Sequence, residues 1–473
     1  MNCRITRESP HSPCRFLPSS VAMISLLTFA AVGGVSTLSA AGRSNVLYIE
    51  NNNPATGQNA ILGYTRNADG SLTDLPGSPF YTNGTGYRNT NEVIGPDDTD
   101  GELLLSPDKL FLFAVNEGSN DISVFRVRLD GTLRLVPGSP FASGGKFPAS
   151  LAWSNGYLYV ANRGDGVLPV MITPTYVPGA RGGTNYTAFF INGDGSLIAR
   201  PELTVNAPDG SSPAQVVTSS DGQFLWALTP FSPTNDPYVV PIFPASQSRL
   251  LSFALDEDDG SMDARAEVAL PSNPLFTING VNRGGFMLGI RPHPTQNILY
   301  ANAVLANVLS VWTWDQTGAL TFAGAVDPGA VGRSPDPCWL AVDPMGRWAY
   351  AASVNPDQVV AYSLANPLMP VALQNLTLAG PKAPLPAGTP EPYGSTTAPF
   401  NLSVDPQGKF VYVANHATCV TTSVDATNCP LGNAIHILKI NTDGTLTEQP
   451  NSPYIFPPTM VPVNARPKGL AVL

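Results

Sequence analysis

Five ionisable side chains stand at equivalent points of repeated segments, where they could take part in acid–base chemistry. Glu102 and Lys468 each open a short apolar run, and Glu117, Arg163 and His416 each follow an Asn that ends such a run. A carboxylate near a histidine and a cation can move protons and stabilise a developing negative charge. We predict these five as catalytic candidates, although Glu102 and Lys468 can equally form a structural ion pair.

The positions that correspond to Glu102 in several other segments carry neutral side chains. Gln215, Met287, Trp339 and Asn401 each stand just before an apolar run, and Met287 and Trp339 are large and apolar. A pocket with one apolar wall and a few convergent charged groups suits a small or medium organic molecule. We therefore predict these four as ligand-binding residues, and a small-molecule ligand or substrate as the partner.

These positions belong to seven imperfect copies of one segment, which fill the chain from about residue 46 to its end. Residues 103–141 and 402–454 are the clearest copies, and each contains four short β-type runs. Asp-Gly turns such as Asp130-Gly131 join the last two runs, because Gly supplies the positive φ that tight hairpins require. One four-stranded antiparallel meander per copy predicts an all-β fold, a seven-bladed β-propeller.

The two ends of the repeat region complement each other. The first copy begins at VLYIENN and lacks an innermost strand, whereas the chain ends in RPKGLAVL, which is an innermost strand with nothing after it. We expect residues 469–473 to pair beside residues 46–51 and close the ring. Closure removes exposed strand edges, so a monomer is expected.

The N-terminal segment differs from the copies. Residues 21–35 are apolar, follow three arginines and precede small residues suited to cleavage. This pattern is typical of a secretory signal peptide, so we expect residues 1–41 to be removed and residues 42–473 to form a single propeller domain. The apolar run is short for a membrane span. We expect a secreted or periplasmic protein without stable membrane insertion; a single membrane anchor, or a translation start near Met23, is the alternative.

Charge and motifs exclude several function classes. The formal net charge is −10 at pH 7, which disfavours nucleic acid and anionic membranes as partners. The sequence contains no GxSxG, HExxH, GxxxxGK[ST] or CxxCH motif. We therefore predict neither a cofactor nor a metal. The acidic loop 96–102 leaves one alternative open, since Asp97, Asp98 and Asp100 could hold Ca²⁺.

Two cysteines bracket one loop of the last copy. Cys419 and Cys429 are separated by polar and small residues, and an exported protein is expected to join them in a disulfide. Cys338 begins an apolar run, so we expect it to be a small buried side chain rather than a nucleophile.

The placement of extra residues points to one face of the ring. In such a meander the first and third turns lie on one face, and the second turns and the links between blades lie on the other. All long insertions are of the second kind, at residues 81–100, 164–185, 230–248, 271–284, 379–398, 417–433 and 455–465. Ligand binding is expected on this elaborated face. Neutral drift of tolerant loops is the alternative.

The repeat motifs resemble those of a known family. Within a copy, a second run of the YVAN type (at Tyr159 in one copy) precedes a third run of the ISVF type (Ile122) and a DGTL turn (Asp130), and this order resembles that of the lactonase-type seven-bladed propellers. GSPF at Gly138 is an outer-strand ending of the same kind. This family includes 6-phosphogluconolactonase and carboxymuconate-cyclase enzymes, and the resemblance covers nearly the whole mature chain.

The resemblance also indicates where this chain departs from the family's enzymes, which carry His, Arg and Glu on inner strands and nearby loops. The positions that correspond to these residues hold Phe286-Met287, Ala303 and Ala214-Gln215. We therefore expect a ligand-binding propeller without the family's standard catalytic residues. A lactone hydrolase or cyclase with a diverged acid–base site is the alternative.

Overall fold

A computed structural model describes most of the chain after residue 44. The described residues are 45–88, 99–164, 183–207, 211–233, 246–278, 281–282, 285–332, 334, 336–354, 357–380, 397–417, 433–462 and 465–473. The chain divides into two units, Met1–Leu38 and Ser39–Leu473, and every described residue belongs to the second. The expected signal peptide, the expected Cys419–Cys429 disulfide, and Asp97 and Asp98 lie outside the described residues.

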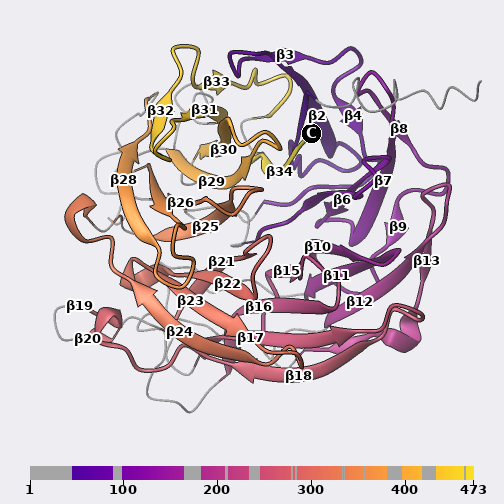
Figure 1. The fold of residues 1–473 in the computed structure, drawn as a ribbon. Helices are drawn as coiled ribbons and strands as arrows, with labels where there is room; N and C mark the ends of the chain where they lie inside the picture. Colours follow the sequence, from indigo (N-terminus) through magenta and orange to yellow (C-terminus); the bar gives the residue numbers. More distant parts are fainter. Residues whose placement is uncertain are drawn as a thin grey trace, which may run out of the picture. The chain divides into compact units, whose positions relative to one another are not determined.

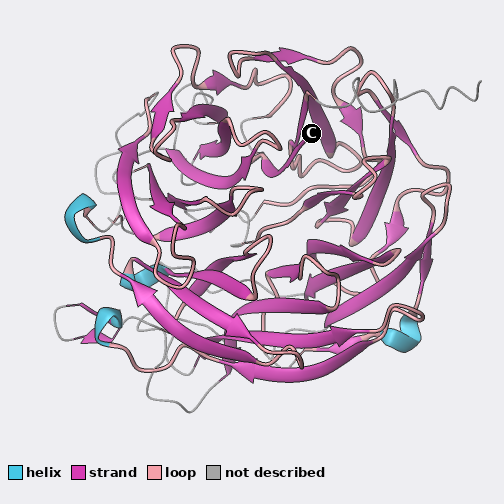
Figure 2. Cartoon of the chain, in the orientation of Figure 1, coloured by secondary structure: helices cyan, strands magenta, loops and turns pink. Residues whose placement is uncertain are grey.

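The described residues of the second unit form seven antiparallel sheets of four or five strands and one two-stranded sheet, so the predicted all-β, seven-bladed propeller is confirmed (Figures 1 and 2). The innermost strands are β34 (Lys468–Val472), β5 (Leu103–Leu105), β10 (Pro148–Ser154), β15 (Gln215–Thr218), β21 (Met287–Pro292), β25 (Pro337–Val342) and β29 (Thr397–Val404). We number the blades 1 to 7 in this order. The second strands are β1 (Val46–Glu50), β6 (Phe111–Asn116), β11 (Tyr157–Arg163), β16 (Phe224–Pro233), β22 (Ile298–Ala303), β26 (Trp348–Ser353) and β30 (Phe410–Ala417).

The outer half of each blade follows the same order. The third strands are β2 (Ala60–Arg66), β7 (Asp121–Val127), β12 (Thr184–Ile191), β17 (Ser246–Leu255), β23 (Val308–Trp314), β27 (Gln358–Ser363) and β31 (Ala434–Ile440). The fourth strands are β3 (Leu72–Asp74), β8 (Leu133–Leu135), β13 (Leu197–Ala199), β18 (Met262–Val268), β24 (Leu320–Val326), β28 (Val371–Thr377) and β32 (Leu446–Glu448).

Four blades carry one more strand than the sequence predicted. The additional strands are β4 (Phe80–Tyr81), β9 (Phe141–Ala142), β14 (Val205–Asn206) and β33 (Tyr454–Ile455), and each pairs with the third strand of its blade. In blade 2 the Ser139 hydroxyl, within the GSPF motif, accepts a hydrogen bond from Val124 N at 2.8 Å. The motif thus divides the outer edge of the blade into two short strands, β8 and β9.

A few short elements lie outside the blade strands. They are the two-stranded pair β19 (Thr277–Ile278) and β20 (Val281–Asn282), and the 3-10 helices η2 (Pro201–Leu203), η3 (Pro274–Phe276), η4 (Val304–Ala306) and η5 (Gly329–Val331). Among the residues that the structure describes, none of these helices has the length and apolar character that a bilayer span requires.

The C-terminal strand closes the ring as predicted. The strand β34 pairs antiparallel with β1, with Leu47 opposite Val472 and Ile49 opposite Leu470. Figure 1 shows this yellow strand beside the indigo strands of the first blade. Blade 1 is therefore assembled from both ends of the propeller, which leaves no inner edge of β1 unpaired.

Neighbouring blades are joined by a tyrosine that the repeat places on the second strand. Its hydroxyl donates to the glycine carbonyl of the Asp-Gly turn in the next blade, as Tyr159 does to Gly260 and Tyr350 does to Gly444, both at 3.2 Å. Gly444 has φ +87°, and a Cβ there would lie 2.4 Å from the ring of Trp348. Glycine is therefore required at Gly444 both by the backbone conformation and by the close approach of the adjoining blade.

The core lies between the faces of adjoining blades. Every residue of β6 and β11 is buried, because both faces of these second strands pack against neighbouring sheets. Such strands appear in the sequence as continuous apolar runs rather than as alternating ones. One hydrophobic cluster extends from Phe224 in blade 4 to Leu446 in blade 7. This packing fixes the inner strands whose first residues meet at the centre.

Candidate functional site

The charged residues predicted at the strand openings form a buried cluster around Lys468. Its ammonium makes an ion pair with Glu117, and both side chains are fully buried. Burial lowers the pKa of Lys468, but attraction to Glu117, Glu50 and Glu102 outweighs that effect and leaves the pKa raised. The sequence-based alternative of a Glu102–Lys468 pair is therefore replaced by a Glu117–Lys468 pair, with Glu102 as a further neighbour.

Glu102 is fully buried beside this pair. Its Oε1 accepts a hydrogen bond from Thr99 Oγ1 at 2.6 Å, and Asn401 Nδ2 lies 3.4 Å from its Oε2. Burial raises the pKa of Glu102 to about 7, against the opposing attraction of Lys468. Such a pKa suits an acid–base group, but the carboxylate is 0% exposed.

Glu50 also belongs to the cluster, although it was not among the residues predicted from the sequence. Burial raises its pKa to about 8, although Lys468 and a 2.7 Å hydrogen bond from Asn59 Nδ2 favour the ionised form. Glu50 ends the apolar strand β1, and its position before Asn51 was the only available signal. Three carboxylates therefore surround one lysine within the described residues.

His416 and Arg163 make other contacts. The His416 ring stacks on Phe400 with 4.1 Å between centroids, and its Nε2–H donates to the Pro467 carbonyl. Burial, together with the nearby charge of Arg466, holds the pKa of His416 well below its usual range, so the ring is neutral. The Arg163 guanidinium donates from Nε and Nη2 to Ser212 Oγ, each at 3.2 Å.

Three of the four predicted ligand-binding residues converge on Thr99 and Asp100, which precede β5. Trp339 Nε1 donates to the Thr99 carbonyl at 2.9 Å. Gln215 Nε2 and Asn401 Nδ2 donate to the two oxygens of Asp100, at 3.2 and 3.1 Å. Met287 instead lies in the hydrophobic core and is 0% exposed. The segment at Thr99 and Asp100 thus contacts innermost strands from several blades at the centre of the propeller.

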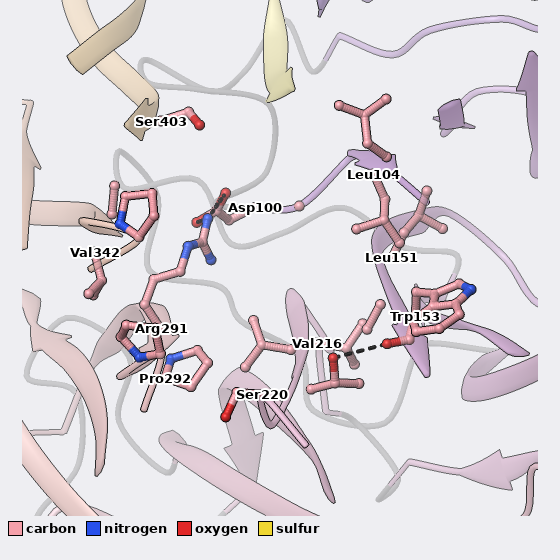
Figure 3. Close-up of a pocket in the computed structure, with 18 of the residues that line it drawn as sticks. Asp100, Leu104, Leu151, Trp153, Val216, Ser220, Arg291, Pro292, Val342 and Ser403 are labelled. Atoms are coloured by element: carbon pink, nitrogen blue, oxygen red, sulfur yellow. Dashed lines mark hydrogen bonds and ion pairs between the residues drawn. The ribbon is translucent and has the colours of Figure 1, made fainter. Parts of the chain in front are cut away.

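A cavity of about 810 Å³ adjoins Asp100 (Figure 3). Its wall is largely apolar, with Leu104, Leu151, Val216 and Val342 contributed by separate inner strands. Arg291 extends into it and forms an ion pair with Asp100 at 2.9 Å, while its side chain remains 24% exposed. A cavity of this volume and lining is of the kind that holds small organic ligands.

The cavity lies at the centre of the ring, toward the face where the innermost strands end. The first turns of several blades contribute to its lining, through Pro107, Asn155, Gly222, Pro294 and Pro344. These turns belong to the face opposite the long insertions. The predicted binding site on the elaborated face stays a prediction, since most of each of the long loops 164–185, 230–248, 379–398 and 417–433 lies outside the described residues.

The described residues offer no evident metal centre. Within them, no group of three or more His, Cys, Asp or Glu side chains is placed to hold a metal ion. Asp100, the one described residue of the three Asp that could hold Ca²⁺, is engaged with Arg291, Gln215 and Asn401.

Comparison with known proteins agrees with the repeat motifs. The family model described as the lactonase seven-bladed β-propeller matches residues 26–171. The predicted resemblance to the lactonase-type propellers is confirmed. A search of the curated proteins finds no match to this sequence.

Several solved structures share the fold over most of the chain. A candidate 6-phosphogluconolactonase from Bacteroides fragilis has a TM-score of 0.57 at 14% identity, covering 91% of this chain and 99% of that one. The periplasmic gluconolactonase of Pseudomonas aeruginosa has a TM-score of 0.55 at 16% identity, covering 87% and 97%. A hypothetical selenium-binding protein from Sulfolobus tokodaii has a TM-score of 0.54 at 14% identity, covering 90% and 93%. At these identities the likeness establishes the fold alone.

Proposed function

We propose that this protein is an exported, monomeric lactonase-type propeller that binds a small or medium organic ligand in its central cavity. The cavity itself carries the proposal, because it combines walls from separate blades with a polar group, Arg291, that remains partly exposed. Apolar walls give affinity, and a few fixed polar groups give orientation. Export is supported by the signal-like N-terminus and by the periplasmic location named for the Pseudomonas aeruginosa structure.

Burial of the five predicted catalytic residues favours ligand binding over acid–base catalysis by those residues. Glu102, His416 and Lys468 are 0% exposed, and Glu117 and Arg163 are 1% exposed. Each also makes internal contacts: Glu117 with Lys468, Glu102 with Thr99, and His416 with Pro467. A substrate would have to displace these contacts before it reached any of the five groups.

Lactone hydrolysis or cyclisation is the second candidate function. It is favoured by the pairing of a carboxylate with a cation at the cavity, since Asp100 is 5% exposed and adjoins Arg291. In that case Asp100 would serve as the base and Arg291 would stabilise the charge that develops on the carbonyl oxygen.

One set of assays tests both functions. The exported protein should be titrated calorimetrically with sugar-acid lactones and with the corresponding open acids, and lactone opening followed by base consumption at constant pH. Saturable binding without turnover above the solution rate supports the binding function, whereas turnover supports the hydrolase.

A cavity-filling variant locates the binding. Ser403 lines the cavity, so S403W should weaken binding at least tenfold by occupying the space. Leu368 is 47% exposed in an outer turn of blade 6, so L368W adds similar bulk elsewhere and should bind normally. Equal affinity of folded S403W and the unmodified protein would place the ligand outside this cavity.

A further inference from the structure

Hydrogen-bond donors from three blades surround the carboxylate of Asp100, and a fourth blade holds the backbone beside it. Oδ1 receives Arg291 Nη2 at 3.0 Å and Asn401 Nδ2 at 3.1 Å. Oδ2 receives Gln215 Nε2 at 3.2 Å and also lies 2.9 Å from the Arg291 guanidinium. In blade 6, Trp339 Nε1 donates to the Thr99 carbonyl. Both carboxylate oxygens are therefore satisfied by donors that the inner strands provide.

The two amides are oriented by the propeller itself and not by Asp100. Asn401 Oδ1 accepts a 2.8 Å hydrogen bond from Gly469 N, in the adjoining innermost strand. Gln215 Oε1 accepts a 2.7 Å hydrogen bond from Ile290 N, in the next blade. An amide whose oxygen is held by a backbone N–H must present its NH₂ group on the other side. Both NH₂ groups therefore point to the same place before any carboxylate arrives.

Asp100 and the three donors belong to different kinds of segment. The donors stand on inner strands packed between neighbouring blades, whereas Asp100 belongs to the link that precedes β5. The cavity reaches this group, because Asp100, Arg291 and Asn401 all line it. A fixed set of donors thus meets a side chain from a connecting segment, at a point that a small molecule in the cavity can approach.

We propose that Gln215, Arg291 and Asn401 form a carboxylate-binding site and that Asp100 occupies it as an internal competitor. A ligand carboxylate that enters through the cavity replaces the Asp100 carboxylate on the same donors. This inference rests on the proposed binding function and deepens it by naming the recognised group as a small organic carboxylate. Competition with Asp100 weakens binding of such a ligand: the apparent Kd equals the intrinsic Kd divided by the fraction of molecules in which the site is free.

Chemical rescue of D100A tests the donor set directly. The variant lacks the internal carboxylate, the one acceptor that all three donors share, although Gln215 and Arg291 also donate to the Ile290 carbonyl; it should therefore unfold at a lower temperature than the unmodified protein. Sodium formate should raise its Tm saturably by a few degrees over sodium chloride of equal ionic strength, because a ligand stabilises the state that binds it. The unmodified protein should show no formate-specific rise at the same concentrations.

A double variant serves as the matched control. D100A/R291M keeps the vacated space but lacks the cation, so the formate-specific rise should disappear. The proposal is overturned if formate and chloride act alike on folded D100A, or if the double variant responds as D100A does. Should D100A not fold in chloride, refolding in formate is compared; recovery in formate alone supports the proposal, and recovery in neither salt overturns it.

The same experiment separates this inference from the proposed function. A formate response in D100A, with no binding of larger organic molecules by either protein, would confirm the donor set and reject the cavity as a ligand site. Conversely, ligand binding that S403W abolishes, with no formate response in D100A, would keep the proposed function and reject the carboxylate site.

Discussion

Replacing Glu50 with glutamine should make the protein more stable above pH 7 and change the pH dependence of its stability. Glu50 is 0% exposed, and its Oε2 receives no hydrogen bond from the part of the chain that the structure describes. Asn59 Nδ2 donates to Oε1 at 2.7 Å, a contact that the glutamine oxygen can keep. The substitution therefore removes an ionisable group while retaining its volume and its hydrogen bond.

The direction of this pH dependence follows from how many protons the folded and the unfolded protein bind. Burial raises the pKa of Glu50 from 4.5 to about 8, so the folded protein holds a proton that the unfolded chain loses near pH 4.5. Stability is then complete below about pH 4.5 and falls as the pH rises to about 8. Each pKa unit corresponds to about 1.4 kcal/mol, so the loss has an upper limit of about 5 kcal/mol. Glu102, with a pKa of about 7, also lowers stability as the pH rises, and this second loss is complete near pH 7.

Denaturant unfolding at pH 5.5, 7 and 8.5 provides the assay. At pH 5.5, one unit above the pKa of 4.5 in the unfolded chain, E50Q should exceed the unmodified protein by at most about 1.4 kcal/mol, and at pH 8.5 the difference should be larger, roughly 2 kcal/mol or more. Glu202 provides a control, because its carboxylate is 56% exposed beside Arg200, and E202Q should shift stability by no more than about 0.5 kcal/mol at any of these pH values. Parallel pH profiles for E50Q and the unmodified protein would refute the reasoning.

Further predictions concern packing, closure and the disulfide. W339A should cost about 3–5 kcal/mol of unfolding free energy, since the Trp339 ring is 1% exposed and lies 3.7 Å from the Phe400 ring centroid; a denaturation loss below about 1 kcal/mol would contradict this. Deleting residues 466–473 should expose the edge of β1, lower Tm and cause self-association in size-exclusion chromatography; an unchanged Tm and monomeric elution would argue against closure by this strand. Peptide mapping of exported protein without reduction should recover Cys419 and Cys429 in one linked fragment, and alkylation of both would exclude the bond.

The repeated motifs allowed the blade architecture to be predicted because they encode local geometry. Asp-Gly, as at Asp443, and an Asn at the end of the second strand recur at the same register in most copies, so these copies specify the same meander. The missing inner strand of the first copy and the unpaired run at residues 469–473 then required ring closure, as the β1–β34 pairing confirms. The interblade tyrosines, such as Tyr159, recur at the same register, but a repeat motif alone does not show that their hydroxyls bond to the next blade.

Part of the candidate site followed from the same register. Equivalent positions on inner strands point to the same axis, so Gln215, Trp339 and Asn401 were predicted to converge, and the structure brings all three to Thr99 and Asp100. Met287 occupies an equivalent position but lies in the core. A repeat fixes where a strand opens, whereas the packing of its neighbours decides whether the side chain reaches the axis.

The sequence by itself determined the fold class, the number of blades, the closing strand and the set of positions near the axis, because hydrophobic periodicity and turn chemistry act over a few residues. Only the tertiary structure decided which charges meet. Lys468 pairs with Glu117 and has Glu50 as a neighbour, although several hundred residues separate them in the chain. Asp100 lies outside the repeat register, in a link whose path no local pattern specifies. Its position among donors from separate blades depends on how the whole ring packs, and that packing is a property of the assembled blades rather than of any one segment.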